Sequence, residues 1–189
     1  MDKDGYLELI LGPMFSGKST KLIQYIRKYK TLKYSMIIIK PNIDTRYTAN
    51  NEICTHDYVK ENCIVYGMNE LHNIYNEKLY NTTKIIIIEE GQFFNNIYDI
   101  IKKMVDDDKK IIYISALNGD SNRNIFGDIY KLIPICNNIV FLKSLCIECN
   151  DGTLGIFSKR LINSKEQIAV GGSNEYIGVC RKHYLNDNI

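Results

Sequence analysis

One eight-residue stretch restricts the fold of this 189-residue chain more than any other feature. Residues 12–19 read GPMFSGKS and match the pattern G-x-x-x-x-G-K-[ST] at every fixed position. Residues 6–11 before it are mostly apolar, and residues 20–32 after it carry apolar side chains at helical spacing. We therefore expect a buried strand, a glycine-bearing turn and a helix, the order in which many parallel α/β sheets begin.

Each fixed position of this loop suits the binding of phosphate groups. Glycine at positions 12 and 17 lets backbone N–H groups approach phosphate oxygens, and the start of the following helix favours anions. Lys18 is expected to reach the β- and γ-phosphates of ATP, and Ser19 to offer its hydroxyl to Mg²⁺. The residues expected to hold the triphosphate are Gly12, Met14, Phe15, Ser16, Gly17, Lys18, Ser19 and Thr20. A chance match in a glycine turn is the alternative, and the flanking strand and helix weaken it.

The rest of the chain alternates apolar runs with helical patterns. We expect strands at residues 35–40, 63–66, 84–88, 110–116 and 139–142, and helices near residues 97–105 and 126–132. Residues 41–59 are polar, lack periodicity and are expected to form a mobile loop. This order predicts an α/β fold, a parallel sheet flanked by helices. Residues 1–143 are expected to form this nucleotide-binding domain, and residues 144–189 a smaller, irregular lobe.

The balance of charge argues against a large anionic partner. The chain has 24 lysine and arginine residues against 22 aspartate and glutamate residues, a formal net charge of +2. It therefore lacks a strong positive field that would attract nucleic acid or an anionic membrane. No apolar run approaches the roughly 20 residues that cross a bilayer, and residues 1–6 are charged rather than signal-like. We expect a cytoplasmic protein with a small substrate, and neither nucleic acid nor a membrane as partner.

Two adjacent glutamates follow the apolar run at residues 84–88. A carboxylate at the end of a strand that neighbours the phosphate-loop strand can hold the hydration shell of a magnesium ion. Successive side chains diverge at a strand end, so we assign Glu89 to Mg²⁺ and Glu90 to the acceptor hydroxyl, as the base that takes its proton. The alternative is a solvated charge pair that only closes the strand, and the complete phosphate loop favours the functional interpretation.

Four metal-type residues form two short pairs near the end of the chain. Cys146 and Cys149 make a C-x2-C pair, and Cys180 and His183 make a C-x2-H pair. Three thiolates and one imidazole suit a closed tetrahedral Zn²⁺ site, which would hold together a lobe too small for its own core. Unrelated reduced thiols are the alternative. Residues 151–179 between the pairs are expected to form a loop, tied at both ends, that closes over a ligand.

The order of these motifs resembles the type II thymidine kinases, the family of the cytosolic cellular enzyme and of the poxvirus and bacterial enzymes. The resemblance spans almost the whole chain. It rests on GPMFSGKST at residues 12–20, DTRY at 44–47, Thr55-His56, EGQFF at 90–94, Ala116-Leu117 with Phe126-Gly127, and the zinc pairs flanking Gly171-Gly172 and Tyr176. It implies a RecA-like sheet, a zinc lobe that carries a lasso-like loop, and a homo-tetramer. It also implies ATP-dependent phosphorylation of the 5′-hydroxyl of thymidine, with deoxyuridine as a further acceptor, in pyrimidine deoxynucleotide salvage.

The same resemblance implies roles for individual residues. Glu90 would deprotonate the 5′-hydroxyl, and Asp44 and Arg46 would act near the phosphates. The thymine base would lie beneath the lasso-like loop, whose backbone near residues 169–171 would supply hydrogen bonds. The nucleoside-binding residues would be Met14, Phe93, Leu117, Phe126, Ala169, Val170, Gly171 and Tyr176. For the apolar members, plain core packing is the alternative.

Three positions depart from the usual residues of the family. Glu89 and Asn118 stand where the family has Asp, and Ser121 stands where it has an aromatic residue. These departures leave the acceptor range open, and they also leave open a nucleotide-binding protein without catalysis. A nucleic-acid-stimulated ATPase is the other alternative, because a phosphate loop beside a zinc knuckle also occurs in DNA-handling proteins. The near-neutral charge argues against it.

Overall fold

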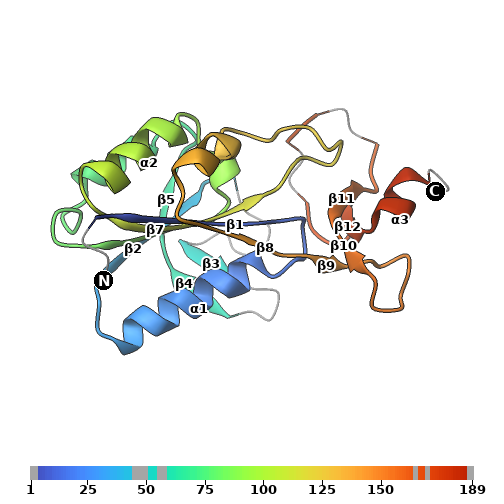
Figure 1. The fold of residues 1–189 in the computed structure, drawn as a ribbon, viewed down its shortest axis with the longest axis horizontal. Helices are drawn as coiled ribbons and strands as arrows, with labels where there is room; N and C mark the ends of the chain where they lie inside the picture. The colour runs from blue at the N-terminus through green and yellow to red at the C-terminus, as the bar shows by residue number, and fades with distance from the viewer. Residues whose placement is uncertain (1–3, 44–50, 55–58, 164–165, 169–170, 187–189) are drawn as a thin grey trace.

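The centre of the molecule is a six-stranded parallel sheet (Figure 1). The computed structural model describes residues 4–43, 51–54, 59–163, 166–168 and 171–186. The strand order is β5-β2-β6-β7-β1-β8, and every neighbouring pair is parallel. The strands are β1 (Tyr6–Gly12), β2 (Met36–Pro41), β5 (Ile64–Tyr66), β6 (Ile85–Ile88), β7 (Ile111–Leu117) and β8 (Asn138–Phe141). The predicted α/β fold is therefore confirmed, and each of these strands lies close to its expected position.

The central strands send alternate side chains into two separate cores. On β1, Leu9 packs into one core and Ile10 into the other, and on β6 Ile86 and Ile87 divide in the same way. All four residues of β6 are fully buried. This two-sided burial explains why the strand consists of an uninterrupted apolar run.

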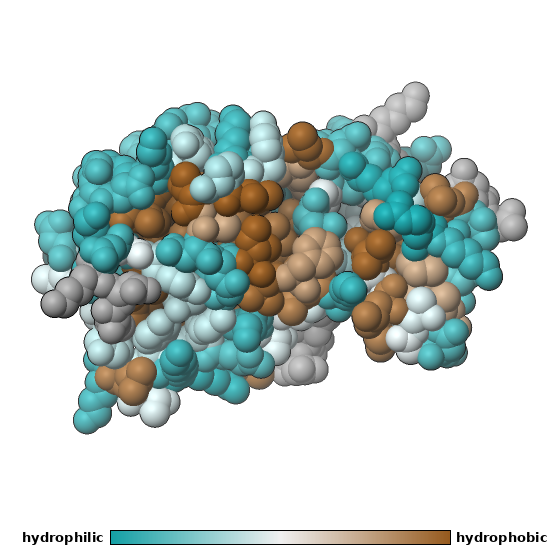
Figure 2. Space-filling view, viewed as in Figure 1, coloured by the Kyte–Doolittle hydropathy of each residue, from teal (hydrophilic) through white to brown (hydrophobic). Residues whose placement is uncertain are grey.

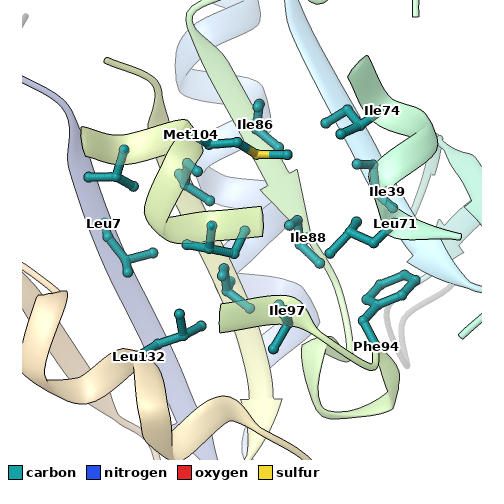
Figure 3. Packing of buried hydrophobic residues seen from close by; sticks show 14 of the residues in the cluster. Leu7, Ile39, Leu71, Ile74, Ile86, Ile88, Phe94, Ile97, Met104 and Leu132 are labelled. Carbon is teal, nitrogen blue, oxygen red and sulfur yellow. The ribbon is translucent and has the colours of Figure 1, made fainter. Parts of the chain in front are cut away.

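Helices cover both faces of the sheet. One face is covered by α1 (Lys18–Thr31), and the other by α2 (Ile97–Asp106) together with the 3₁₀ segments η1 (Leu71–Asn76) and η3 (Ile129–Ile135) (Figure 1). Figure 3 shows the core between the sheet and α2, in which Ile97, Met104 and Leu132 pack against Leu7, Ile86 and Ile88. The helix predicted near residues 126–132 is thus a 3₁₀ segment that contains Pro134, and η1 was not predicted. Among the described residues, no helix is both long enough and apolar enough to span a bilayer.

The strand order corrects one expectation. The strand before the two glutamates was expected to neighbour the phosphate-loop strand, but β7 lies between β6 and β1. Sequence patterns indicate that strands exist but not in which order they pair, because all the central strands are rich in apolar residues. All strands are parallel, so the carboxyl ends of β1, β6 and β7 still meet at one edge of the sheet.

Residues 41–59 contain more regular structure than expected. The described part of this stretch includes β3 (Glu52–Cys54), which pairs in antiparallel fashion with β4 (Lys60–Asn62). Lys40 on β2 donates a 2.8 Å hydrogen bond to the backbone oxygen of Glu52 and so ties this ribbon to the sheet. The expectation of a loop throughout this stretch missed β3, because a three-residue strand is too short to show periodicity.

The C-terminal lobe is also more regular than expected. Its described residues form two small antiparallel sheets and one short helix (Figure 1). These elements are β9 (Ser144–Leu145), β10 (Leu154–Gly155), β11 (Phe157–Arg160), β12 (Tyr176–Val179) and α3 (Arg181–Leu185). The prediction of an irregular tail was therefore wrong, since strands of two to four residues leave little pattern in a sequence.

Polar contacts join the lobe to the sheet. The N–H of Met14 donates a buried 2.9 Å hydrogen bond to the hydroxyl of Ser158 on β11. The Tyr184 hydroxyl donates a 2.6 Å hydrogen bond to the backbone oxygen of Ser121, and the guanidinium of Arg123 lies 4.5 Å from the centre of the Tyr184 ring. The lobe is thus fastened to the loop that follows β1 and to the loop that follows β7.

Candidate active site

The phosphate loop connects β1 to α1 through two residues with left-handed backbone, Phe15 (φ 63°) and Gly17 (φ 83°). A Cβ atom at Gly12 would lie 2.6 Å from the backbone oxygen of Leu142, so a larger residue does not fit there. Ser19 lies in the first turn of α1, which begins at Lys18, two residues before the expected start of the helix. The loop therefore presents the start of a helix and closely approaching backbone, the arrangement that favours phosphate groups.

The side chain of Lys18 points into this loop. It is buried, and its Nζ donates a 2.7 Å hydrogen bond to the backbone oxygen of Pro13. The hydroxyl of Ser16 donates a 2.8 Å hydrogen bond to the same oxygen. An ammonium group at this position can exchange a neutral carbonyl partner for charged phosphate oxygens, which form stronger hydrogen bonds with it.

The two glutamates lie at the carboxyl end of β6, and both are buried, with 3% of Glu89 and 5% of Glu90 exposed. The backbone N–H of Glu89 continues the sheet ladder to the backbone oxygen of Ile39. Glu90 leaves the sheet with φ 51°, and its N–H donates a 3.3 Å hydrogen bond to the hydroxyl of Ser115. This left-handed residue turns the chain, so the two side chains leave the strand differently. Burial excludes the alternative of a solvated charge pair.

A neighbouring glutamine holds the carboxylate of Glu90 in place. Gln92, which is buried, donates from Nε2 to Oε2 of Glu90 at 2.5 Å, and its Oε1 accepts the N–H of Leu117 at 3.1 Å. Both ends of the amide are therefore used, and this fixes its orientation. The sequence showed Gln92 only as part of the EGQFF motif and assigned it no role; its position two residues after Glu90 was the available signal.

One pocket brings Glu90 together with many of the predicted nucleoside-binding residues. Its empty volume is about 500 Å³, including the open mouth. The predicted residues that line it are Met14, Glu90, Phe93, Leu117, Phe126, Gly171 and Tyr176. The rings of Phe93 and Phe126 meet edge to face, with centroids 5.3 Å apart. The pocket thus joins the phosphate loop, the end of β6 and the C-terminal lobe in one space.

The same pocket is lined by residues that the sequence did not assign to it. These are Ile43, Gly119, Asp120, Ser121, Ser158, Arg160, Gln167 and Ile168. Ser121 had been identified only as a departure from the family pattern. The others come from short loops and from β11, where no periodicity or motif distinguishes a lining residue from a surface residue.

Four predicted site residues lie outside the described part of the chain. They are Asp44 and Arg46, assigned to the phosphates, and Ala169 and Val170, assigned to the nucleoside. Their assignments remain sequence-based predictions.

The two cysteine-containing pairs form one cluster. The sulfur atoms of Cys146, Cys149 and Cys180 and a ring nitrogen of His183 all lie within 4.8 Å of one another. The Cys149 sulfur is 3.2 Å from Nδ1 of His183 and 3.8 Å from the Cys180 sulfur. Ligand atoms of a tetrahedral zinc ion are separated by similar distances, because Zn–S bonds are about 2.3 Å and Zn–N bonds about 2.0 Å long. The donor set therefore fits Zn²⁺ with no coordination position left open.

Comparison with known proteins gives a consistent result. Residues 5–184 match the family described as "Thymidine kinase". The chain is 38% identical over 181 residues to the thymidine kinase of Rabbit fibroma virus, covering 96% of this chain and 97% of that protein. It is 39% identical over 181 residues to the Sheeppox virus thymidine kinase, with the same coverage. It is 35% identical over 189 residues to thymidine kinase a of Arabidopsis thaliana, covering 98% of this chain and 77% of that protein.

Proposed function

The chain belongs to the thymidine kinase family and phosphorylates thymidine, and from this premise we propose how its residues carry out the transfer. ATP is the donor, and its γ-phosphoryl group passes to the 5′-hydroxyl of thymidine to give thymidine monophosphate and ADP. The observation that supports the proposal best is the shared pocket: Met14 of the phosphate loop and the buried Glu90 line the same space. Donor and acceptor can therefore meet at one end of this pocket.

The phosphate loop holds the donor. Its backbone N–H groups and the start of α1 surround the triphosphate, and Lys18 leaves the Pro13 oxygen to bind the β- and γ-phosphates. Ser19 and Glu89 offer the hard oxygen ligands that Mg²⁺ prefers, the first from α1 and the second from the end of β6. When bound, magnesium neutralises charge on the phosphates.

Glu90 takes the proton of the acceptor hydroxyl. Phosphoryl transfer depends mainly on positioning and charge neutralisation, so the base needs a fixed carboxylate more than an unusual basicity. Gln92 provides that fixation by holding Oε2 from one side. Because the amide of Gln92 is itself held by the N–H of Leu117, the carboxyl end of β7 also contributes to the placement of the base.

The apolar part of the pocket binds the nucleobase. The edge-to-face pair Phe93 and Phe126 forms a rigid wall, and Tyr176 closes the pocket from the C-terminal lobe. Backbone groups near Gly171 select a pyrimidine, because a purine would leave them without hydrogen-bond partners. Deoxyuridine differs from thymidine only by a methyl group and is expected to be a second acceptor.

The proposal also covers the metal site, the domains and the cellular location. The cysteine and histidine cluster binds a structural Zn²⁺, and residues 1–143 and 144–189 act as two domains. The enzyme works in the cytoplasm, where its thiols stay reduced.

A homo-tetramer is supported by the exposed Ile139 and Phe141 on the edge strand β8 and by the hydrophobic residues gathered across one face in Figure 2. Analytical ultracentrifugation of the purified protein tests the subunit number.

The acceptor assignment can be tested with purified enzyme, ATP, Mg²⁺ and each deoxynucleoside in turn. We expect nucleoside monophosphate from thymidine and deoxyuridine and none from the purine nucleosides. Replacing Phe126 by alanine should raise KM for thymidine and leave KM for ATP unchanged. Equal rates with purines, or an unchanged KM for thymidine in the Phe126→Ala variant, would refute the proposed pocket.

A further inference from the structure

The segment 166–168 lies at the pocket and is held there by its backbone. Arg160 on β11 donates from one terminal nitrogen to the backbone oxygen of Glu166 at 2.7 Å and from the other to that of Gln167 at 3.2 Å. Its Nε donates to the hydroxyl of Tyr176 at 3.1 Å. The planar guanidinium thus joins this segment to the strands β11 and β12 of its own lobe.

The side chain of Gln167 reaches the opposite side of the pocket. Its Nε2 donates a 2.9 Å hydrogen bond to Oδ2 of Asp120 and a 3.0 Å hydrogen bond to the backbone oxygen of Ile125. These partners lie in the loop after β7, more than 40 residues away in sequence. An amide nitrogen has two hydrogens, so both donors are used. We call this set, Gln167 with Asp120 and the Ile125 oxygen, the amide clasp.

The acceptor side of the amide clasp is itself rigid. Asp120 is only 6% exposed, and its Oδ1 accepts the N–H groups of Asn122 at 2.9 Å and Asn124 at 2.8 Å. These bonds hold Oδ1 within its own turn, while Oδ2 faces Gln167 and also accepts a longer, 3.3 Å hydrogen bond from Nδ2 of Asn124. The geometry requires a donor at position 167, because both groups that face it are acceptors.

We propose that Gln167 is a positioning residue for the acceptor nucleoside. The residue that follows it, Ile168, lines the same pocket as Ser121 and Phe126. By joining the segment 166–168 to the loop after β7, the amide clasp keeps this apolar side chain against the nucleoside. Its hydrogen bonds lead to the loop after β7 and not to the phosphate loop, so it acts on acceptor binding and leaves donor binding unaffected. The inference rests on the proposed acceptor pocket.

A purely structural role predicts different behaviour. The side chain of Gln167 is exposed, and it buries little surface whose loss would unfold the chain. A structural role would appear as a lower melting temperature with unchanged kinetics. A positioning role appears as a raised KM for thymidine with an unchanged melting temperature.

The decisive variant is Gln167→Glu, which keeps the shape but removes both donors and faces Asp120 with a like charge. We expect KM for thymidine to rise about tenfold, a loss typical of one or two hydrogen bonds beside a charge. We expect kcat and KM for ATP to stay within about twofold of the parent enzyme. Asn163→Asp is the matched control, because it adds the same charge at an exposed site of the same lobe and should change none of these values.

Reversing the polarity of the clasp provides a rescue. Asp120→Asn alone places an amide donor opposite the donor of Gln167 and should also raise KM for thymidine. In the double variant, the new amide can donate to the new carboxylate at position 167, although that carboxylate still faces the Ile125 oxygen, so we expect KM for thymidine to fall below that of either single variant. Additive effects in the double variant would overturn the clasp and assign Asp120 to its own turn alone.

The two levels of the inference fail separately. If Phe126→Ala raises KM for thymidine while Gln167→Glu does not, the pocket stands and the clasp is wrong. If neither variant changes KM for thymidine, the acceptor pocket itself is wrong, and with it the clasp. A fall in melting temperature with unchanged kinetics in Gln167→Glu would likewise overturn the positioning role.

Discussion

Replacement of Glu90 by glutamine tests the proposed base most directly. The substitution keeps the shape of a side chain that is 5% exposed and removes its ability to accept a proton. Gln92 donates to Oε2 of the carboxylate and can donate in the same way to the oxygen of an amide. The pocket should therefore keep its form, so that a change in rate reports on chemistry and not on folding.

The expected size of the effect follows from the role assigned to the carboxylate. A positioned general base contributes about 10²- to 10⁴-fold to a rate. In a loose phosphoryl-transfer transition state the proton leaves late, so we expect the lower part of this range. This corresponds to a fall in kcat of about 10²- to 10³-fold, or an activation free energy raised by about 3–4 kcal/mol. The charge-assisted hydrogen bond from Gln92 becomes a neutral one, which costs about 1 kcal/mol. Relief of a buried charge offsets this loss, so the melting temperature should stay within about 3 °C.

Steady-state conversion of labelled thymidine measures kcat, and isothermal titration measures ATP binding, which should be unchanged. Asp106→Asn is the matched control, since it removes one carboxylate at the exposed end of α2. A kcat for Glu90→Gln within threefold of the parent value would refute the assignment of the base. A loss of ATP affinity would instead place Glu90 at the donor.

Three further predictions concern the donor, the metal and the alkaline limit of stability. Lys18→Met should lower kcat/KM for ATP at least 100-fold while thymidine still shifts the melting temperature; retained ATP affinity would contradict the role of Lys18. Metal analysis should find one zinc ion per chain. Removing the zinc with a chelator should lower the melting temperature, and so should the substitution Cys149→Ser. A metal-free protein of equal stability would exclude a structural zinc. Burial, with the neighbouring Glu8 carboxylate, raises the pKa of Tyr6 to about 12 from an ordinary value of 10.0, and burial also raises the pKa of Tyr113. The folded state favours the neutral phenols, so their contribution to stability is complete below pH 10 and is lost as the pH rises toward 12. The melting temperature should therefore be constant up to about pH 9.5 and fall above pH 10, less steeply in Tyr6→Phe. A melting temperature that rises across this range would contradict the reasoning.

The sequence predicted best the features that depend on local patterns. The strand before the phosphate loop, the loop itself and α1 are specified by neighbouring residues, and β6 is recognisable because burial on both faces demands an uninterrupted apolar run. The metal-type cluster was predicted for a similar reason. Two short spacings on the same lobe are enough to indicate a tetrahedral donor set.

The features that the sequence did not predict depend on contacts between distant residues. The insertion of β7 between β1 and β6 is a choice among similar apolar strands, and hydrophobic periodicity does not rank them. The orientation of Gln92 depends on the N–H of Leu117, 25 residues later. The contact of Gln167 with Asp120 joins two polar residues that, taken separately, look like ordinary surface side chains.

The hydrogen bond from the N–H of Met14 to the Ser158 hydroxyl orders events during biosynthesis. The two residues are 144 positions apart, and a ribosome adding about 5–20 residues per second makes the second one about 7–30 seconds after the first. Until β11 has emerged and paired with β12, the nascent loop lacks this hydroxyl partner, even when the whole central sheet is already available. The nucleotide cradle therefore gains this hydrogen-bond partner late, although its own residues are translated among the first.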